Sequence, residues 1–400
     1  MQEAYLYDGG RTAFGRQGGI LSSLRPDDML AHVIKTLVER NGFDANDYED
    51  VIAGCTNQAG EDSRNVARFA GLLSGLPIET GGITVNRLCG SSLASAADAA
   101  RCVKVGEGDL FVACGVESMS RAPLILSKAQ SAFDRGQTIA DSTMGARFSN
   151  PKHLAQFGAH SMPETADNIA HDFGISREES DLFALGSQQK YEAACQDGYF
   201  KDEIIPITVN LGRKKGDVLV DADEHPRPGT DIASLQKLRA LFTDGVVTAG
   251  NASGINDGAS AVLIGNKKIG EKAGVKPRAR IISSAIAGVP PRVMGLGPVA
   301  ASQKALARAN LTLKDMDVME FNEAFATQAL GCLKQLGISN DDSRVNPNGG
   351  AIAVGHPLGA SGARILWTSV RQLERTGGRY ALATMCIGIG QGIAVVVERV

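Results

Sequence analysis

Hydrophobic and polar positions along this chain follow two different periods, and the two kinds of segment alternate. Short apolar runs bounded by glycine or polar residues predict strands, and apolar positions every three or four residues predict helices. Helical spacing over 26–39 begins with Asp27 and Asp28, and acidic residues favour the first turn of a helix. The predicted strands are 4–7, 49–53, 110–115, 259–264, 317–321, 380–385 and 393–397, and further helices are predicted at 302–309 and 361–373. This alternation predicts an α/β layered fold.

The pattern repeats weakly between the two ends of the chain. Val51 precedes Cys89 by 38 residues, and Val318 precedes His356 by the same 38 residues. Each end point is followed by a helix rich in small residues and then by a strand that ends in a cysteine. A duplication of this kind predicts two similar α/β halves related by a pseudo-two-fold axis. Coincidence in a sequence rich in glycine and alanine is the alternative.

Residues 120–249 do not fit the repeat and are more polar. Pro163 opens one predicted helix, at a position where proline is tolerated, and Ser176 with Glu179 forms a capping box for the next. We interpret this segment as an insertion packed over the site. The predicted units are an N-terminal half (1–119 plus 250–270), a loop domain (120–249) and a C-terminal half (271–400).

Composition limits the classes of function. The 400 residues carry 41 Lys and Arg against 44 Asp and Glu, a net charge of -3, which argues against a nucleic-acid binder. Seven cysteines, an odd number without the spacing of zinc sites, predict free thiols in a reducing compartment. We find no apolar leader at the N-terminus and no apolar run long enough to cross a bilayer. We therefore expect a cytoplasmic protein without a membrane partner.

The stretch TVNRLCGSSLASAADAARCV (84–103) places one thiol where an extended segment turns into an alanine-rich helix. A cysteine at a helix N-terminus experiences free N–H groups and the positive end of the helix dipole, which lower its pKa. Cys89 is therefore a candidate nucleophile. The alternative is a small buried hydrophobic residue, which is the commoner role of a free cysteine.

Two glycine-rich segments near the C-terminus carry further candidates. In NGGAIAVGHPLGASGAR (348–364), His356 lies at the place that corresponds to Cys89 in the other half, so it is a candidate base. It lacks HxxxH or HxH spacing, and zinc is not predicted. In CIGIGQG (386–392), Cys386 ends a buried strand beside backbone N–H groups, which suits a proton donor and an oxyanion hole. A core histidine and an ordinary strand-end cysteine are the alternatives.

Two more segments suit a ligand site. NEAFATQ (322–328) follows a predicted strand, so Asn322 is a candidate to hold a water or a carbonyl oxygen, with an ordinary turn asparagine as the alternative. VTAGNASGINDGASA (247–261) is rich in glycine and small hydroxyl residues but lacks GxxxxGK[ST], so it is not a nucleotide P-loop. This loop suits close packing against a narrow ligand chain.

Four blocks in order, NRLCGSS, NEAFA, GHPLGASGAR and CIGIGQG, resemble the thiolases, and the resemblance extends from RTAFG at residue 11 to the C-terminus. It implies a fold of two duplicated layered halves (αβαβα) with an inserted loop domain, usually assembled as a homotetramer. It implies Cys89 as nucleophile, His356 as its activating base and Cys386 as the acid and base at the acetyl α-carbon. Asn322 would hold the water of one oxyanion hole together with His356. The N–H groups of Cys89 and Gly388 would form the other.

The resemblance also implies which residues contact the acyl-CoA. Ser253 in TAGNAS would lie near the pantetheine, Arg227 in DEHPRPGT would face the adenine end of coenzyme A, and Met162 and Phe325 would line the acyl pocket. Coenzyme A is then a co-substrate, and neither a tightly bound cofactor nor a metal is implied. The family usually has glycine where Ser92 stands, which puts the shape of the acyl pocket in question.

The segments SRAP (120–123), SAFDRGQ (131–137) and HSMPETADNIAHDFGISREESD (160–181) look most like thiolases that cleave 3-oxoadipyl-CoA with CoA to succinyl-CoA and acetyl-CoA in the β-ketoadipate pathway of aromatic compound catabolism. The free carboxylate of that substrate needs a cation or donors, and Arg121, Arg147 and His160 are candidates. The alternatives are a thiolase for acetoacetyl-CoA or fatty 3-oxoacyl-CoA, a ketosynthase and a non-catalytic lipid carrier. Ketosynthases normally present two histidines, whereas this chain has Asn322. The intact nucleophile, base and acid argue against a carrier.

Overall fold

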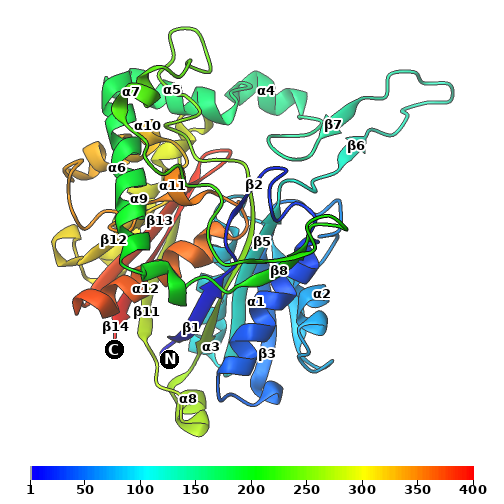
Figure 1. The fold of residues 1–400 in the computed structure, drawn as a ribbon, viewed down its shortest axis with the longest axis vertical. Coiled ribbons are helices and arrows are strands. Elements are labelled where there is room, and N and C mark those ends of the chain that lie inside the picture. The colour runs from blue at the N-terminus through cyan, green and yellow to red at the C-terminus, as the bar shows by residue number, and fades with distance from the viewer. Residues whose placement is uncertain (1) are drawn as a thin grey trace.

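A ten-stranded mixed sheet contains strands from both the N-terminal and the C-terminal parts of the chain (Figure 1). The structure, a computed structural model, describes residues 2–400; Met1, the first residue of the predicted N-terminal unit, lies outside the described residues. The strand order is β12-β13-β14-β11-β1-β10-β5-β3-β4, with β2 paired to β10. The bounds are β1 (Tyr5–Arg11), β2 (Gly15–Arg16), β3 (Tyr48–Gly54), β4 (Gly81–Val85), β5 (Leu110–Ser118), β10 (Asn256–Gly265), β11 (Ala279–Gly288), β12 (Val318–Phe321), β13 (Tyr380–Ile387) and β14 (Gln391–Arg399).

The strand order confirms the duplication. Strands β3, β5, β10 and β1 mirror β12, β13, β14 and β11 about the centre of the sheet, and β4 is an additional edge strand on the N-terminal side. The neighbours β3 and β5 are parallel, as are β12 and β13. The two halves meet where β1 pairs with β11 over two residue pairs, Tyr5 with Arg280 and Leu6 with Ala279. The sequence repeat therefore corresponds to a structural repeat.

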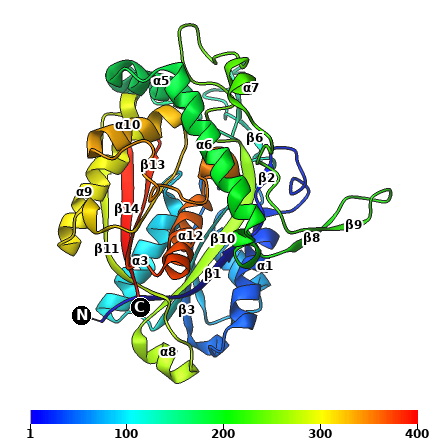
Figure 2. The ribbon, with the colours of Figure 1, turned by 60° about the vertical axis from the view of Figure 1, so that its left-hand side comes forward.

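The two halves of this sheet form two layers, and helices between and outside them form three more (Figure 2). Helices α3 (Ser91–Val105) and α12 (Ser361–Thr376) lie together in the middle, and each contacts strands of both halves. Helices α1 (Pro26–Arg40) and α2 (Val66–Leu73) cover the outer face of the N-terminal strands, and α9 (Gly297–Ala309) covers that of the C-terminal strands. Three apolar cores fill the spaces between these layers. The predicted αβαβα arrangement is confirmed.

The central helices approach closely because small residues face each other. A Cβ added at Gly362 of α12 would lie 2.2 Å from the backbone nitrogen of Leu93 in α3. A Cβ added at Gly54, the last residue of β3, would lie 2.4 Å from the backbone nitrogen of Ser92. A side chain at Gly362 would push the two helices apart, and one at Gly54 would push β3 away from α3. The small-residue composition of both helices therefore brings the first turn of α3 beside the first turn of α12.

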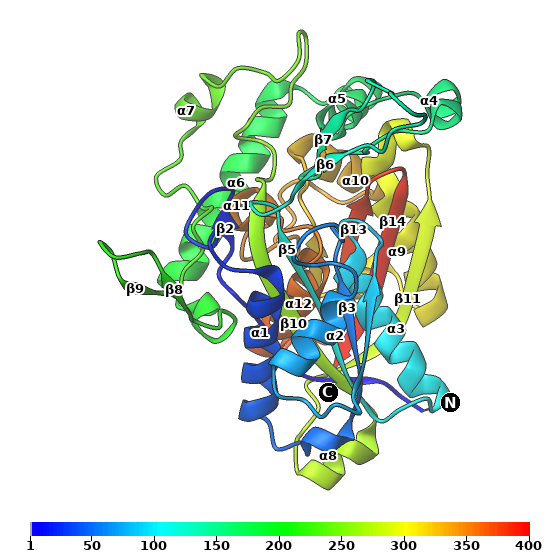
Figure 3. The same cartoon turned by 90° about the vertical axis from the view of Figure 1, so that its right-hand side faces the viewer.

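Most of residues 120–249 lie across one end of the strands, and part of the segment runs down beside them (Figure 3). The predicted helix at Pro163 is α5 (Met162–Phe173), and the predicted capping box of Ser176 and Glu179 opens α6 (Arg177–Gln196). A hairpin of β6 (Leu124–Leu126) and β7 (Ile139–Asp141) projects from the body (Figure 1). The remaining elements there are α4 (Pro151–Phe157), β8 (Ile207–Asn210), β9 (Asp217–Val220) and α7 (Ile232–Gln236).

The other helices belong to the two halves. They are α8 (Lys267–Ala273), α10 (Ala326–Leu336) and α11 (Ala351–Val354). Helix α5 contacts α10, and α6 contacts α10 and α11, so the inserted segment packs against the C-terminal half. Within residues 2–400, no helix combines the length and the apolar composition that crossing a membrane requires.

Candidate active site

Cys89 lies in a tight turn immediately before α3. Leu88 adopts the left-handed conformation (φ 47°), and its N–H donates to Asn86 Oδ1 at 2.9 Å. Ser91 closes the turn from the other side, because its Oγ accepts from the N–H of Arg87 at 2.9 Å and donates to the carbonyl of Leu88 at 2.6 Å. These short-range hydrogen bonds hold the backbone of Cys89 at the start of the helix.

Burial changes the pKa of the Cys89 thiol more than the N-terminus of the helix does. Cys89 is partly exposed, so a ligand can reach it. Desolvation nevertheless raises the pKa of the thiol to about 11, and hydrogen bonds from the N–H groups of Gly388 and of Cys89 itself act in the opposite direction. The expectation of a lowered pKa is therefore wrong for the ligand-free protein. Cys89 is a neutral thiol there and needs a base to become a nucleophile.

His356 is buried, and its ring is fixed at both nitrogens. Nδ1 lies 2.6 Å from Ser361 Oγ, and that hydroxyl donates its one hydrogen to the carbonyl of Pro357 at 2.9 Å. Nδ1 must therefore carry a proton, which leaves Nε2 as the acceptor. Desolvation, followed by the nearby charge of Arg364, lowers the pKa of His356 to about 3. The imidazole is thus neutral. Ser361 is not among the residues predicted from the sequence, although its place five residues after His356 at a helix start is a usable signal.

Asn322 lies beside His356. It follows β12, and its Nδ2 is 3.3 Å from His356 Nε2. The backbone N–H of Asn322 donates to the carbonyl of Thr384 at 3.0 Å, which fixes the residue to β13. Its Oδ1 is buried and has no hydrogen-bond partner within residues 2–400. A buried acceptor of this kind costs free energy unless a water or a ligand satisfies it.

Cys386 and Gly388 come from the end of β13. Cys386 is buried, and its pKa is raised well above the ordinary thiol value by desolvation and by the nearby thiol of Cys89. Cys386 is therefore a protonated thiol. A Cβ added at Gly388 would lie 3.1 Å from Leu88 Cδ1 and 3.7 Å from the Met162 sulfur. The glycine leaves this space open in front of Cys89.

Apolar side chains surround the Cys386 thiol. Phe325, Met294 and Cys386 belong to one small cluster of buried residues, and Met162 packs against it from α5. Ser253 lies next to this cluster, because its N–H donates to the carbonyl of Ala324 at 2.9 Å. The structure therefore brings Met162, Phe325 and Ser253 to the same place as Cys386.

The basic residues that were predicted to contact the substrate or coenzyme A differ in their surroundings. Arg227 is exposed, and within residues 2–400 its guanidinium makes no hydrogen bond or ion pair. Its backbone N–H donates to Gln188, and its carbonyl accepts from Thr230. Arg121 forms a two-point ion pair with Glu61, so its charge is already compensated. His160 is exposed, and Arg147 donates to the carbonyl of Ser142 at 2.6 Å. These contacts leave Arg121 the weakest of the candidates for a substrate carboxylate.

The Ser92 side chain points into the contact between the two central helices. Its side chain is fully buried, and its Oγ accepts from the N–H of Ala363 in the first turn of α12 at 2.9 Å. Ala360, the N-cap of α12, has no side chain that can cap those N–H groups. Ser92 therefore caps a neighbouring helix. This direction of the hydroxyl predicts a structural role for Ser92.

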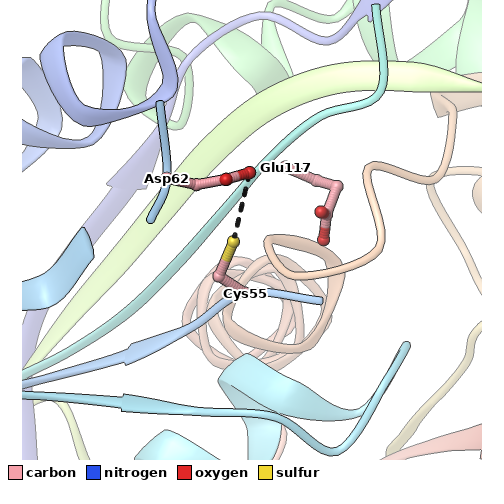
Figure 4. Close-up of side chains that lie close together, drawn as sticks. All are labelled: Cys55, Asp62 and Glu117. Atoms are coloured by element: carbon pink, nitrogen blue, oxygen red, sulfur yellow. Dashed lines mark hydrogen bonds between the residues drawn. The ribbon is translucent and has the colours of Figure 1, made fainter. Parts of the chain in front are cut away.

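One thiol and two carboxyl groups lie close together in the N-terminal half. Cys55, Asp62 and Glu117 offer atoms within 4.8 Å of one another, close enough to bind a metal ion (Figure 4). Glu117 instead accepts three backbone N–H groups, from Thr56 and Asn57 at 3.1 Å and from Gly359 at 2.9 Å. Desolvation raises its pKa to about 7. This carboxylate links the N-terminal half to the GHPLG segment and is occupied by those donors.

Comparisons with known proteins agree with this geometry. Residues 4–268 match the thiolase N-terminal domain and residues 275–399 the thiolase C-terminal domain. The chain is 55% identical to the β-ketoadipyl-CoA thiolase of Acinetobacter baylyi and 55% identical to the 3-oxoadipyl-CoA/3-oxo-5,6-dehydrosuberyl-CoA thiolase of Escherichia coli K12, each over 100% of both chains. The crystal structure of human mitochondrial 3-ketoacyl-CoA thiolase is 40% identical with a TM-score of 0.92, covering 100% of this chain and 99% of that one. The chain therefore belongs to the thiolase family of acyltransferases, for which coenzyme A is a substrate.

Proposed function

We propose that this chain cleaves 3-oxoadipyl-CoA with coenzyme A to succinyl-CoA and acetyl-CoA through an acyl-Cys89 intermediate. The observation that carries the proposal is a partly exposed thiol with a second, protonated thiol near it, and a neutral imidazole fixed at Nδ1 just before the neighbouring central helix. They come from the start of α3, the end of β13 and the loop before α12. A nucleophile, a base and an acid are the groups that cleavage of a 3-oxoacyl thioester requires.

The first half of the reaction uses all three groups. His356 Nε2 accepts the proton of Cys89, and the thiolate attacks the ketone carbon of the substrate. The bond between the α-carbon and the ketone carbon then breaks, and its electron pair forms the enolate of acetyl-CoA. The protonated Nε2 of His356 and a water held at Asn322 Oδ1 stabilise the enolate oxygen. The Cys386 thiol donates its proton to the α-carbon, which releases acetyl-CoA.

The second half transfers the acyl group to coenzyme A. The CoA thiol gives its proton to the Cys386 thiolate and attacks the acyl-Cys89 thioester. The N–H groups of Cys89 and Gly388 stabilise the oxyanion, and this assignment is supported by their effect on the Cys89 thiol, because both N–H groups lower its pKa. Collapse of this intermediate forms succinyl-CoA, and Cys89 recovers its proton from His356. Both thiols and the imidazole return to their starting states.

The substrate assignment rests on the relatives. The two curated proteins that are 55% identical over their full length carry names that specify β-ketoadipyl-CoA or 3-oxoadipyl-CoA. A thiolase for acetoacetyl-CoA or fatty 3-oxoacyl-CoA is the second candidate. Met162, Met294 and Phe325 favour it, because they form an apolar lining that suits an uncharged acyl chain.

Steady-state thiolysis tests the assignment. We would measure kcat/KM for 3-oxoadipyl-CoA, acetoacetyl-CoA and 3-oxohexadecanoyl-CoA in one buffer, with the Cys89→Ala variant as the control for the mechanism. We expect a clear preference for the dicarboxylate and no thiolysis by the variant. Equal or faster turnover of acetoacetyl-CoA would reject the substrate and leave the mechanism intact. Full activity of the Cys89→Ala variant would reject the mechanism.

Coenzyme A is placed along the loop domain in this proposal. Ser253 faces the pantetheine, and Arg227, whose guanidinium is uncompensated, faces the phosphate and adenine end. Met162 and Phe325 contact the acyl chain. We retain the division into residues 1–119 plus 250–270, 120–249 and 271–400, with β10 of the second segment lying between β1 and β5.

We also propose that the chain forms a homotetramer in the cytoplasm. Strand β4 is an unpaired sheet edge, and exposed Phe69, Leu73 and Ile83 lie on it and on neighbouring α2. Exposed apolar side chains, Leu124, Leu126 and Ile139, also line the projecting β6–β7 hairpin. Such surfaces are typical of subunit contacts. The seven cysteines are all free, which supports a reducing compartment.

A further inference from the structure

We infer that Asn256 is the positioning residue that holds His356 opposite Cys89, by fixing the catalytic loop of the C-terminal half to the N-terminal half. The inference rests on the proposed function, because it concerns the group that takes the Cys89 proton. Asn256 is the first residue of β10 and is fully buried. Asn256 takes no part in the bond-forming, bond-breaking and proton-transfer steps proposed above.

The side chain of Asn256 makes two hydrogen bonds in opposite directions. Its Oδ1 accepts the backbone N–H of His356 at 2.8 Å, and its Nδ2 donates to the carbonyl of Gly15 at 2.9 Å. A backbone N–H can only donate and a backbone carbonyl can only accept, so the orientation of this amide is determined. No other side chain of this size offers both groups in one plane. Aspartate lacks the donor, and leucine lacks both.

The loop before His356 leaves space for the Asn256 side chain. Gly355 has φ 106°, a conformation that favours glycine, and a Cβ there would lie within 2.9 Å of the Asn256 side chain. Gly15, the other partner, belongs to β2, which pairs with the start of β10. Asn256 therefore ties the backbone just before the imidazole to a strand pair of the N-terminal half.

Asn256 and Ser361 divide the placement of His356 between them. Ser361 fixes the rotation of the ring through Nδ1, at 2.6 Å, whereas Asn256 fixes the backbone nitrogen from which the side chain departs. Cys89 comes from the other half of the molecule, so its distance to Nε2 depends on how the halves are joined at this loop. Proton transfer is sensitive to such distances, and a displacement near 1 Å lowers rates by about 10²-fold.

Two substitutions and a matched control test this role. Asn256→Ala removes both hydrogen bonds, and Asn256→Asp keeps the acceptor for His356 but faces the Gly15 carbonyl with a second acceptor. Asn266→Ala is the control, because Asn266 is a buried asparagine just beyond the other end of β10 that caps α8 through the N–H of Ile269. We would measure kcat, KM, the thermal midpoint and the rate at which iodoacetamide alkylates Cys89 in the full-length chain.

We expect kcat of the Asn256→Ala variant to fall by about 10²-fold with KM changed by less than about twofold, because the displaced base acts in chemistry and not in binding. Alkylation of Cys89 should slow in parallel. The kcat and alkylation rate of Asn256→Asp should lie between those of the wild type and of Asn256→Ala. Asn266→Ala should lower the thermal midpoint and leave kcat and alkylation unchanged.

The outcomes separate this inference from the proposed function. Wild-type kcat and alkylation in both Asn256 variants would overturn the role of Asn256. The role would also be overturned if Asn266→Ala and Asn256→Ala had the same thermal midpoint and lost kcat equally. A wild-type protein that does not catalyse thiolysis would instead reject the proposed function.

Discussion

Replacing Ser92 by alanine should destabilise the protein without changing which acyl-CoA it prefers. The Oγ of Ser92 accepts the N–H of Ala363 at 2.9 Å in a fully buried position. Removing it leaves that N–H without this acceptor, at a cost of about 1–3 kcal/mol. Alanine regains up to about 0.5 kcal/mol through its higher helix propensity. The net loss is therefore about 0.5–2.5 kcal/mol, which lowers the thermal midpoint of a chain of this length by about 1–3 °C.

The assay compares two measurements on the same preparations. Thermal melts at one protein concentration give the change in stability, and the ratio of kcat/KM for 3-oxoadipyl-CoA and acetoacetyl-CoA gives acyl preference. Ser95→Ala is the matched control, because Ser95 is equally buried in α3 but its Oγ donates only to the carbonyl of Ser91, one turn back. A changed substrate ratio with an unchanged midpoint would show that the Ser92 hydroxyl faces the acyl pocket, and the reasoning would fail.

Two further predictions follow from charge and exposure. Glu117 has a pKa of about 7 in the fold against 4.5 without burial, so the folded state binds more protons between those values and this residue lowers stability as pH rises from about 4.5 to 7. Denaturation at pH 5 and pH 8 should therefore show a smaller pH dependence for Glu117→Gln than for the wild type, and an equal dependence would contradict the assignment. Ile83 is exposed on edge strand β4, and Ile83→Glu should reduce the particle size in sedimentation velocity because a buried carboxylate opposes subunit contact. Unchanged sedimentation would exclude this face as an interface.

Elements with clear periodicity were predicted closely, and the misses have physical causes. The helix predicted at 26–39 is Pro26–Arg40, and the strand predicted at 110–115 extends to Ser118. The first strand runs to Arg11, beyond its apolar residues, because the Arg11 guanidinium is buried against Glu203 and Asp223 at 2.6 Å. Those partners lie about two hundred residues away along the chain. A local pattern of hydrophobic residues does not contain them.

Strand β4 was missed for the opposite reason. It is an edge strand with exposed or half-buried residues, so its sequence GGITV lacks the apolar run of a central strand. Short edge strands are stabilised by the hydrogen bonds of one neighbour, here β3, and not by a buried face.

The electrostatics of the site were beyond local reasoning. A helix N-terminus lowers the pKa of a thiol, and this rule led to the expectation for Cys89. In the fold, desolvation outweighs the backbone N–H groups and raises the pKa to about 11. The same cause keeps His356 neutral and Cys386 protonated. Burial is a property of the packed layers and cannot be read from the residues flanking one cysteine.

By itself, the sequence determined the α/β class, the duplication and the chemistry-bearing segments around Cys89, Asn322, His356 and Cys386, because these depend on residue type, periodicity and spacing along the chain. Only the tertiary structure decided the direction of the Ser92 hydroxyl, the support of His356 by Ser361 and Asn256, and the pairing of Arg121 with Glu61. Three of these four contacts join residues that are 60 to 271 positions apart. The contacts of Ser92 and Asn256 join the two halves, and that of Arg121 joins the loop domain to the N-terminal half, so no local pattern encodes these partners.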